Sequence, residues 1–167
     1  VLGVPGMNYS MLLPRSVDFD TYEAVFEPAY PNDLNRTVIL AITQMLWDRG
    51  EGAGYVQHIT TDPYPVTPVK TVLLDVAYGD HQVTPLSALI AARALGATIH
   101  RPLAADGRWI EVEPGWGLET TEYPSTGSAI IIWDSGMAAM PFEILAPRVG
   151  DDSHEDPRRD PDVREQK

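Results

Sequence analysis

The 167-residue chain contains no cysteine, which excludes disulfides, thiolate nucleophiles and cysteine-ligated zinc sites. It has no apolar run near the roughly 20 residues that span a bilayer. Basic residues are also few, because 12 Lys and Arg stand against 24 Asp and Glu, a formal net charge of −12. A nucleic-acid surface and docking on anionic lipid both need clustered cations, so this balance argues against either one.

What the chain does contain is typical of one globular domain. Apolar residues make up 44% of it and charged residues 22%, and the length is enough for one real core. The 15 prolines and 13 glycines predict many loops and abrupt element ends. Much of the negative charge is concentrated in the last stretch, at Asp151, Asp152, Glu155, Asp156, Asp160 and Asp162. We therefore divide the chain into a main unit, residues 1–150, and an acidic tail, residues 151–167, that ends on the first turns of a helix.

Alternating strands and helices predict the fold class. Residues 71–77 form a nearly continuous apolar, β-branched run that is typical of a central parallel strand. A helix follows over 85–95, with Pro85 at its start and Gly96 as its terminator, and then another strand over 97–103. Together they make a βαβ unit. With further strands at 1–4 and 128–133, the chain reads as an α/β protein with a mostly parallel sheet, flanking helices and long loop insertions.

The remaining segments are less regular. Apolar residues recur at helical spacing over 35–47, which predicts a helix that Gly50 ends. Residues 11–34 look loop-like apart from a short helix over 21–26, and residues 50–69 look like a long irregular connection. Residues 104–127 form an insertion with several turn signals. The aromatic residues Tyr9, Phe19, Tyr22, Trp109 and Trp116 either line an apolar pocket or lid or pack beneath the loops.

Asp80 is the first candidate functional residue. It comes directly after the strongest strand and before a helix, and functional side chains of open parallel sheets lie in loops at that end of a strand. Asp80 would then orient a catalytic histidine and favour its positively charged form. The alternative is that Asp80 or Thr84 only caps the following helix, and the spacing alone leaves both possibilities open.

His154 is the second candidate. It is surrounded by Asp151, Asp152, Glu155 and Asp156, and neighbouring carboxylates favour an imidazole that must carry a proton transiently. The alternative is a solvated acidic linker. Two other histidines carry less weight, since His100 lies within a strand and His58 has only Asp62 as a nearby acid.

Four segments resemble a bacterial family of large α/β-hydrolase-like proteins. They are residues 45–51, residues 72–83 with Gly79-Asp80-His81, the tail from His154 to Arg159 with Gln166, and the opening residues 3–10. The last of these is similar to the strand and loop that follow the nucleophile helix in that family. The order of these motifs, which run from one end of the chain to the other, carries the resemblance.

The resemblance implies an α/β-hydrolase fold whose triad members follow the order Ser, Asp, His. Asp80 matches the acid after the late strand and His154 the histidine beyond the last strand. In an ordinary hydrolase that histidine follows its strand closely, whereas here an insertion and another strand intervene. An upstream serine would attack an ester-like carbonyl, with no cofactor and no metal.

The nucleophile itself is missing from the sequence. No Gly-x-Ser-x-Gly elbow is present, and both ends of the chain look cut. We therefore expect a C-terminal part of a serine hydrolase whose partner is the N-terminal half of the same parent. On its own this chain should be inactive, because loss of the nucleophile leaves only weak catalysis.

Two other classes stay open. Asp80, His81 and His154 are acceptable ligands for Zn²⁺ or Mn²⁺, although no close histidine pair forms a ready site. A non-catalytic α/β interaction domain, with Asp80 as a helix cap, is the other possibility. The sequence indicates neither the substrate nor the cellular compartment.

Overall fold

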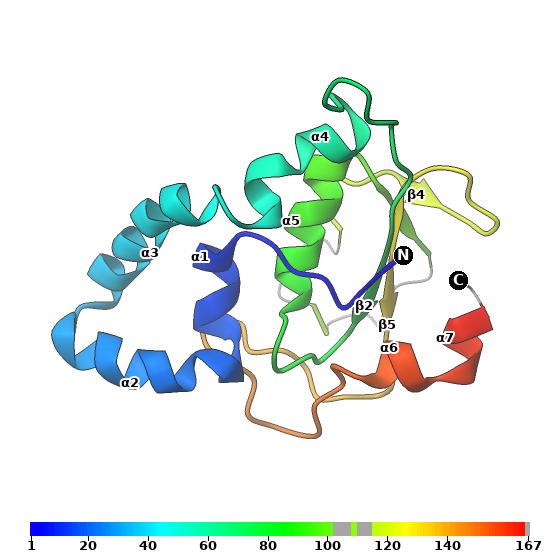
Figure 1. Ribbon diagram of the computed structural model, residues 1–167. Coiled ribbons are helices and arrows are strands. Elements are labelled where there is room, and N and C mark those ends of the chain that lie inside the picture. Colours follow the sequence, from blue (N-terminus) through cyan, green and yellow to red (C-terminus); the bar gives the residue numbers. More distant parts are fainter. Residues whose placement is uncertain (102–107, 110–114, 166–167) are drawn as a thin grey trace.

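The computed structural model describes residues 1–101, 108–109 and 115–165. Their elements, shown in Figure 1, are listed here in chain order: β1 (Leu2–Gly3), α1 (Tyr9–Leu12), η1 (Leu13–Arg15), η2 (Val17–Phe19), α2 (Asp20–Ala29), α3 (Asp33–Trp47), η3 (Gly52–Tyr55), α4 (Gln57–Thr60), β2 (Leu73–Ala77), α5 (Pro85–Leu95), β3 (Thr98–His100), β4 (Thr120–Thr121), β5 (Ala129–Trp133), α6 (Asp156–Arg159) and α7 (Pro161–Glu165). Helices separate β1 from β2 and β2 from β3, as in an α/β protein, whereas β3, β4 and β5 follow one another in this order.

The five strands form one sheet in the order β1-β2-β5-β3-β4, and every pair is parallel. Strands β2 and β5 lie at its centre and pair along their whole length, with Leu74 opposite Ile130 and Val76 opposite Ile132. Both strands are almost wholly buried, as expected for central parallel strands covered by helices. The prediction of an α/β chain with a parallel sheet is therefore confirmed.

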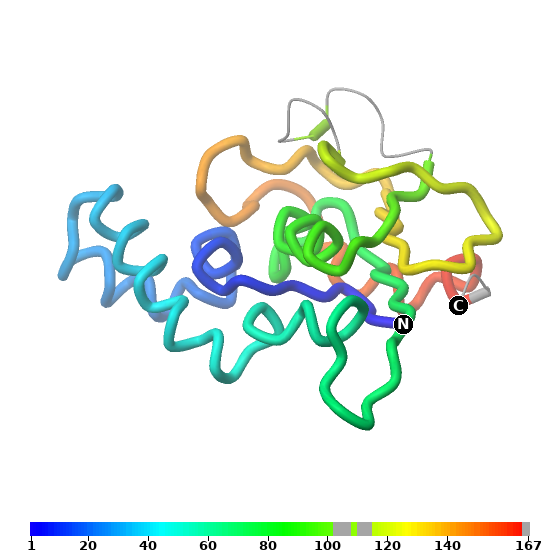
Figure 2. The backbone as a smooth tube through the Cα atoms, turned by 90° about the horizontal axis from the view of Figure 1, so that it is seen from above, coloured from blue at the N-terminus to red at the C-terminus, as the bar shows by residue number. Residues whose placement is uncertain are grey.

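Helix α5 covers one face of this sheet. Figures 1 and 2 both show it between α1 and the strands. Ala88, Ala91 and Ala92 are fully buried on it, and these small side chains let the helix lie close to the apolar sheet. Gly96 ends the helix in the left-handed conformation at φ 64°, as glycine commonly does. The sequence predicted both ends of this helix correctly.

The first half of the chain is more helical than the sequence indicated. The short helix predicted over 21–26 extends over Asp20–Ala29, and the predicted irregular connection 50–69 contains η3 and α4. Pro28 lies inside α2, one residue before the helix ends at Ala29. Part of the insertion predicted at 104–127 lies outside the described residues. Strand β4, within 115–127, was not predicted.

The tail packs against the domain. Ser153, Pro157 and Val163 are buried, and α6 contacts β2. The alternative of a solvated acidic linker is therefore wrong for these positions. The apolar residues Pro157 and Val163 of the tail are covered, whereas most of its charged residues are exposed or half-buried. None of the helices in the described part of the chain is long and apolar enough to cross a bilayer.

We expect the turn after β2 to require glycine at position 79. Gly79 has φ +81°, and an added Cβ would lie 2.5 Å from Met137 Cβ. Gly79→Ala should therefore lower the free energy of unfolding by about 1–3 kcal/mol, measured by urea denaturation. Gly127→Ala is the matched control, because its Cβ would meet nothing within 4 Å. Equal stability of the two variants would contradict this account of the turn.

Candidate active site

Asp80 lies at the carboxyl end of the central strand β2. The strand ends at Ala77, and Tyr78 and Gly79 carry the chain into a turn before α5 begins at Pro85. Tyr78 is buried and its hydroxyl donates to the backbone carbonyl of Arg108. The side chain of Asp80 is only 1% exposed. The carboxylate is thus held away from water at the edge of the sheet where functional groups of parallel sheets gather.

Both carboxylate oxygens of Asp80 are used. Oδ1 accepts the backbone N–H groups of Gln82 and Val83, at 2.8 and 2.7 Å. Oδ2 lies 2.9 Å from Nδ1 of His154, which is 74 positions later in the chain. The structure therefore brings the two predicted residues together.

The predicted helix-capping role does not describe this geometry. The backbone groups that Asp80 binds precede α5, whereas the residue at the N-cap is Thr84. Thr84 makes no side-chain capping bond. Asp80 instead closes the turn with one oxygen and leaves the other for the imidazole.

A second carboxylate, Asp152, holds the histidine in place. Its Oδ1 accepts the backbone N–H groups of His81 and His154, at 2.9 and 3.1 Å, and its Oδ2 accepts from Gln82 Nε2 at 2.7 Å. The neighbouring Ser153 is buried and donates its hydroxyl to the carbonyl of Tyr78 at 2.7 Å. These bonds tie the acidic tail to the loop after β2, so the position of the imidazole depends on both segments.

The contacts of His154 define its tautomer. Nε2 lies 2.8 Å from Nη2 of Arg158, and a guanidinium can only donate. Nε2 is therefore the acceptor, and the ring proton is on Nδ1, directed at Asp80. This arrangement leaves a lone pair on Nε2, as a general base requires. The side chain of His154 is 13% exposed, so the Nε2 side of the pair is near the surface.

The two carboxylates respond to their surroundings in opposite ways. Burial raises the pKa of the Asp80 carboxyl, and the hydrogen bonds from Val83, His154 and Gln82 only partly oppose this effect. For Asp152, burial is again the largest single effect and by itself would raise the pKa. The hydrogen bonds from Gln82, His81 and His154 together outweigh burial, so the pKa of Asp152 is lowered. The difference follows from exposure, because Asp152 stays in contact with water and Asp80 does not.

The other candidates take no part in this pair. His81 contributes its backbone, donating to Asp152 and accepting from Val17 N at 2.9 Å. His100 packs edge-on against Tyr123, and burial lowers its pKa against the opposing effect of Glu122. His58 stacks on Tyr64. Among the described residues, no group of three or more His, Asp or Glu side chains is arranged to hold a metal ion.

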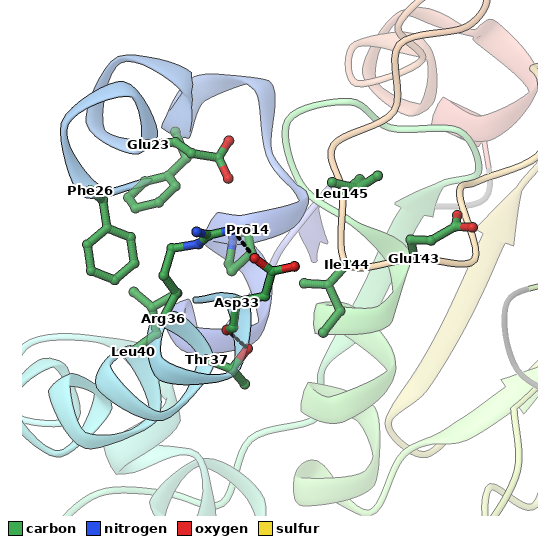
Figure 3. A pocket seen from close by; sticks show the side chains of 11 residues that line it. Pro14, Glu23, Phe26, Asp33, Arg36, Thr37, Leu40, Glu143, Ile144 and Leu145 are labelled. Atoms are coloured by element: carbon green, nitrogen blue, oxygen red, sulfur yellow. Dashed lines mark hydrogen bonds and ion pairs between the residues drawn. The ribbon is translucent and has the colours of Figure 1, made fainter. Parts of the chain in front are cut away.

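A pocket of about 380 Å³ lies between the α2–α3 hairpin and residues 143–145, and neither Asp80 nor His154 lines it. Figure 3 shows its lining, in which the loop residues Ile144 and Leu145 face Phe26 and Leu40 of the α2–α3 hairpin. The pocket is also lined by Pro14 and Phe19. Val17, which lies between these two residues in the sequence, donates its backbone N–H to the carbonyl of His81. One short segment therefore contacts both the pocket and the loop that carries Asp80.

The predicted aromatic lining is only partly found here. Of the five aromatic candidates, Phe19 alone lines this pocket. Tyr9 packs against Trp47 and Trp109 against Tyr78, each as an edge-on pair at 5.8 Å, whereas Tyr22 and Trp116 are exposed. Sequence reasoning did not single out Ile144 or Leu145, because no periodic pattern surrounds them and the pocket forms through long-range contacts. Arg158 was not predicted to contact the imidazole, although it follows His154 by four residues, a spacing that allows such a contact within one helical turn.

Comparison with known proteins finds no matching family model, no matching curated protein and no matching solved structure. The site is therefore interpreted from its geometry.

We expect the opposite pKa shifts to be measurable by NMR. On titration of the side-chain carboxyl ¹³C signals, Asp80 should titrate above the ordinary value of about 3.9 and Asp152 below it. Because the pKa of Asp152 is lower in the folded protein than in the unfolded chain, its ionised carboxylate stabilises the fold. This stabilisation is fully present above the pKa of the unfolded state and is lost as the pH falls through the pKa of the folded state. The pKa of Asp80 is instead higher in the folded protein than in the unfolded chain. Its contribution to stability is therefore present at low pH and is lost as the pH rises through the pKa of the folded state.

The variant Asp152→Asn tests the same point through stability. At neutral pH the free energy of unfolding of this variant should be about 1 kcal/mol lower than that of the native chain. This difference between variant and native chain should shrink as the pH falls below about 4. Asp151→Asn, an exposed neighbour, is the control and should leave stability unchanged. A deficit independent of pH would contradict the assignment to the ionised Asp152.

Proposed function

We propose that Asp80 and His154 are the acid and base of a serine hydrolase that acts on carboxylic ester-like substrates. The observation that carries the proposal is the 2.9 Å contact between a carboxylate that is 1% exposed and an imidazole whose Nε2 is an acceptor. Such a pair, at the carboxyl end of a central parallel strand, can accept the proton of an alcohol. The nucleophile would come from a segment upstream of Val1 in a longer parent.

The chemistry follows from these atoms. As the serine oxygen attacks the ester carbonyl, Nε2 of His154 takes its proton, and the imidazolium is stabilised by Asp80 through Nδ1–H. The same proton then passes from Nε2 to the leaving alcohol, and water repeats the cycle on the acyl-enzyme. Arg158 must withdraw from Nε2 before the serine can bind there, because both groups require the same lone pair.

The pocket at the α2–α3 hairpin, which the Val17 backbone connects to the loop after β2, is the place we propose for an apolar acyl part of the substrate. Its volume of about 380 Å³ falls in the range of small-molecule sites, and Phe19, Phe26, Leu40, Ile144 and Leu145 give it an apolar lining. The polar groups at its rim include Arg36, which Asp33 pairs at 2.7 Å.

A non-catalytic interaction domain is the second candidate. It is favoured by the structural bonds of Asp80 to Gln82 and Val83 and of Asp152 to the loop after β2, because these would hold the tail in place without any reaction. In this reading the contact between Asp80 and His154 serves only to dock the tail.

Labelling with a fluorophosphonate probe distinguishes the two. The longest natural protein that contains this segment should be labelled at a serine upstream of Val1. His154→Ala should reduce the labelling rate at least a hundredfold, because the proton acceptor is lost, and Asp80→Asn should also reduce it strongly.

The control is His58→Ala, which removes a histidine stacked on Tyr64 and distant in sequence from the pair. It should leave the rate unchanged. Each variant is first checked for native circular dichroism. If the folded parent takes no label, or if folded His154→Ala is labelled at the native rate, the hydrolase proposal fails and the interaction-domain reading replaces it.

A further inference from the structure

The apolar pattern that predicts helix α3 lies on its exposed side. Leu40 and Gln44 are the buried residues of the helix, whereas Leu34 is 71% exposed, Val38 49%, Ile42 61% and Met45 71%. Figures 1 and 2 show the α2–α3 hairpin extending away from the sheet. An apolar stripe of this size on a projecting helix marks an interaction surface.

The stripe has the spacing of a helix-pairing seam. Leu34, Val38, Ala41 and Met45 are exposed and are separated by four, three and four residues, which is the a/d pattern of helices that pack side by side. Ile42 lies next to the seam on the same exposed side. We call these five residues the α3 seam.

The seam is self-complementary when two copies run antiparallel. A two-fold axis between positions 39 and 40 places Leu34 opposite Met45 of the second copy, and Val38 opposite its Ala41. Val38 faces the small Ala41, whereas Leu34 faces the flexible Met45, which can adapt its rotamer to the contact. Every contact occurs twice. An isologous interface requires this symmetry, whereas an unrelated partner would not.

Charge favours a second copy over lipid. The five seam residues are uncharged in a chain with a net charge of −12, so two copies can meet here with little repulsion. Helices that lie on membranes have cations along their polar face. The cation of α3 is Arg36, whose guanidinium is 17% exposed and paired with Asp33.

The available area is sufficient for a dimer. Leu34, Val38, Ile42 and Met45 are 49–71% exposed, so the α3 seam offers roughly 500 Å² per copy. Its complete burial on both copies would cover roughly 1,000 Å², the area at which weak specific interfaces begin. We propose that this chain forms a two-fold symmetric dimer through antiparallel packing of the α3 seam. This proposal does not depend on the proposed hydrolase function.

The mass of the 167-residue chain in solution tests the dimer. Light scattering after size exclusion, over a concentration series, should give twice the monomer mass at high concentration. Val38→Glu should weaken the dimer at least tenfold, because two carboxylates would be buried without partners. Val69→Glu is the matched control, an exposed valine outside the seam, and should dimerise like the native chain. A monomer at every concentration, or equal effects of the two variants, would overturn the proposal.

Disulfide trapping tests the direction of packing in this cysteine-free chain. An equal mixture of Leu34→Cys and Met45→Cys should cross-link on oxidation, whereas Leu34→Cys alone should not. In the antiparallel dimer the two Leu34 positions are roughly 16 Å apart along the axis, beyond the reach of a disulfide. Efficient cross-linking of Leu34→Cys with itself would overturn the antiparallel arrangement. Monomeric protein that binds phosphatidylcholine vesicles through Val38 would replace the second copy with a lipid surface.

Discussion

The bond between Asp80 and His154 is one of several contacts between two parts of the chain that lie 74 positions apart in sequence, and it is the one that pairs a buried carboxylate. The carboxylate is buried, and a buried charge is costly unless it is paired and hydrogen-bonded. Here two backbone N–H groups and the imidazole offset part of that cost, and burial still raises the pKa of Asp80. The loop after β2 and the acidic tail consequently depend on each other, and both must be in place before either side chain has a defined position.

The parallel sheet explains why this link forms where it does. Strands β2 and β5 pair in full register at the centre, so the loops that leave their carboxyl ends emerge at the same edge. The loop after β2 carries Asp80. The chain that leaves β5 passes through the segment around Leu145 and then reaches the tail. Tyr78 receives the hydroxyl of Ser153 on its carbonyl, which fixes the tail directly against the end of β2. The positions of the site residues thus depend on the end of strand β2, against which the loop and the tail pack.

The α2–α3 hairpin has a different relation to the sheet. Its inner side, with Phe26 and Leu40, forms a wall of the pocket, while its outer side carries the uncharged α3 seam. One helix therefore contributes apolar surface in two directions. Arg148 pairs with Asp20 at 2.6 Å at the start of α2, so the loop that closes the pocket is also joined to the hairpin. If two copies pack through α3, the pocket wall becomes more rigid on both of them.

The sequence by itself determined the α/β class, the central strands and both ends of α5, because β-branched runs, Pro85 and Gly96 act through local backbone preferences. It also identified Asp80 and His154 as residues of interest. It did not reveal which side of α3 is buried, since a 15-residue helix shows the same periodicity whether its apolar stripe faces a core or solvent. Nor could it predict the tail's packing, because Ser153 and Asp152 look like any polar linker. Only the tertiary structure decided those points: a hydrogen bond across 74 positions leaves no periodic trace in the chain, and it forms only when the sheet brings its two ends together.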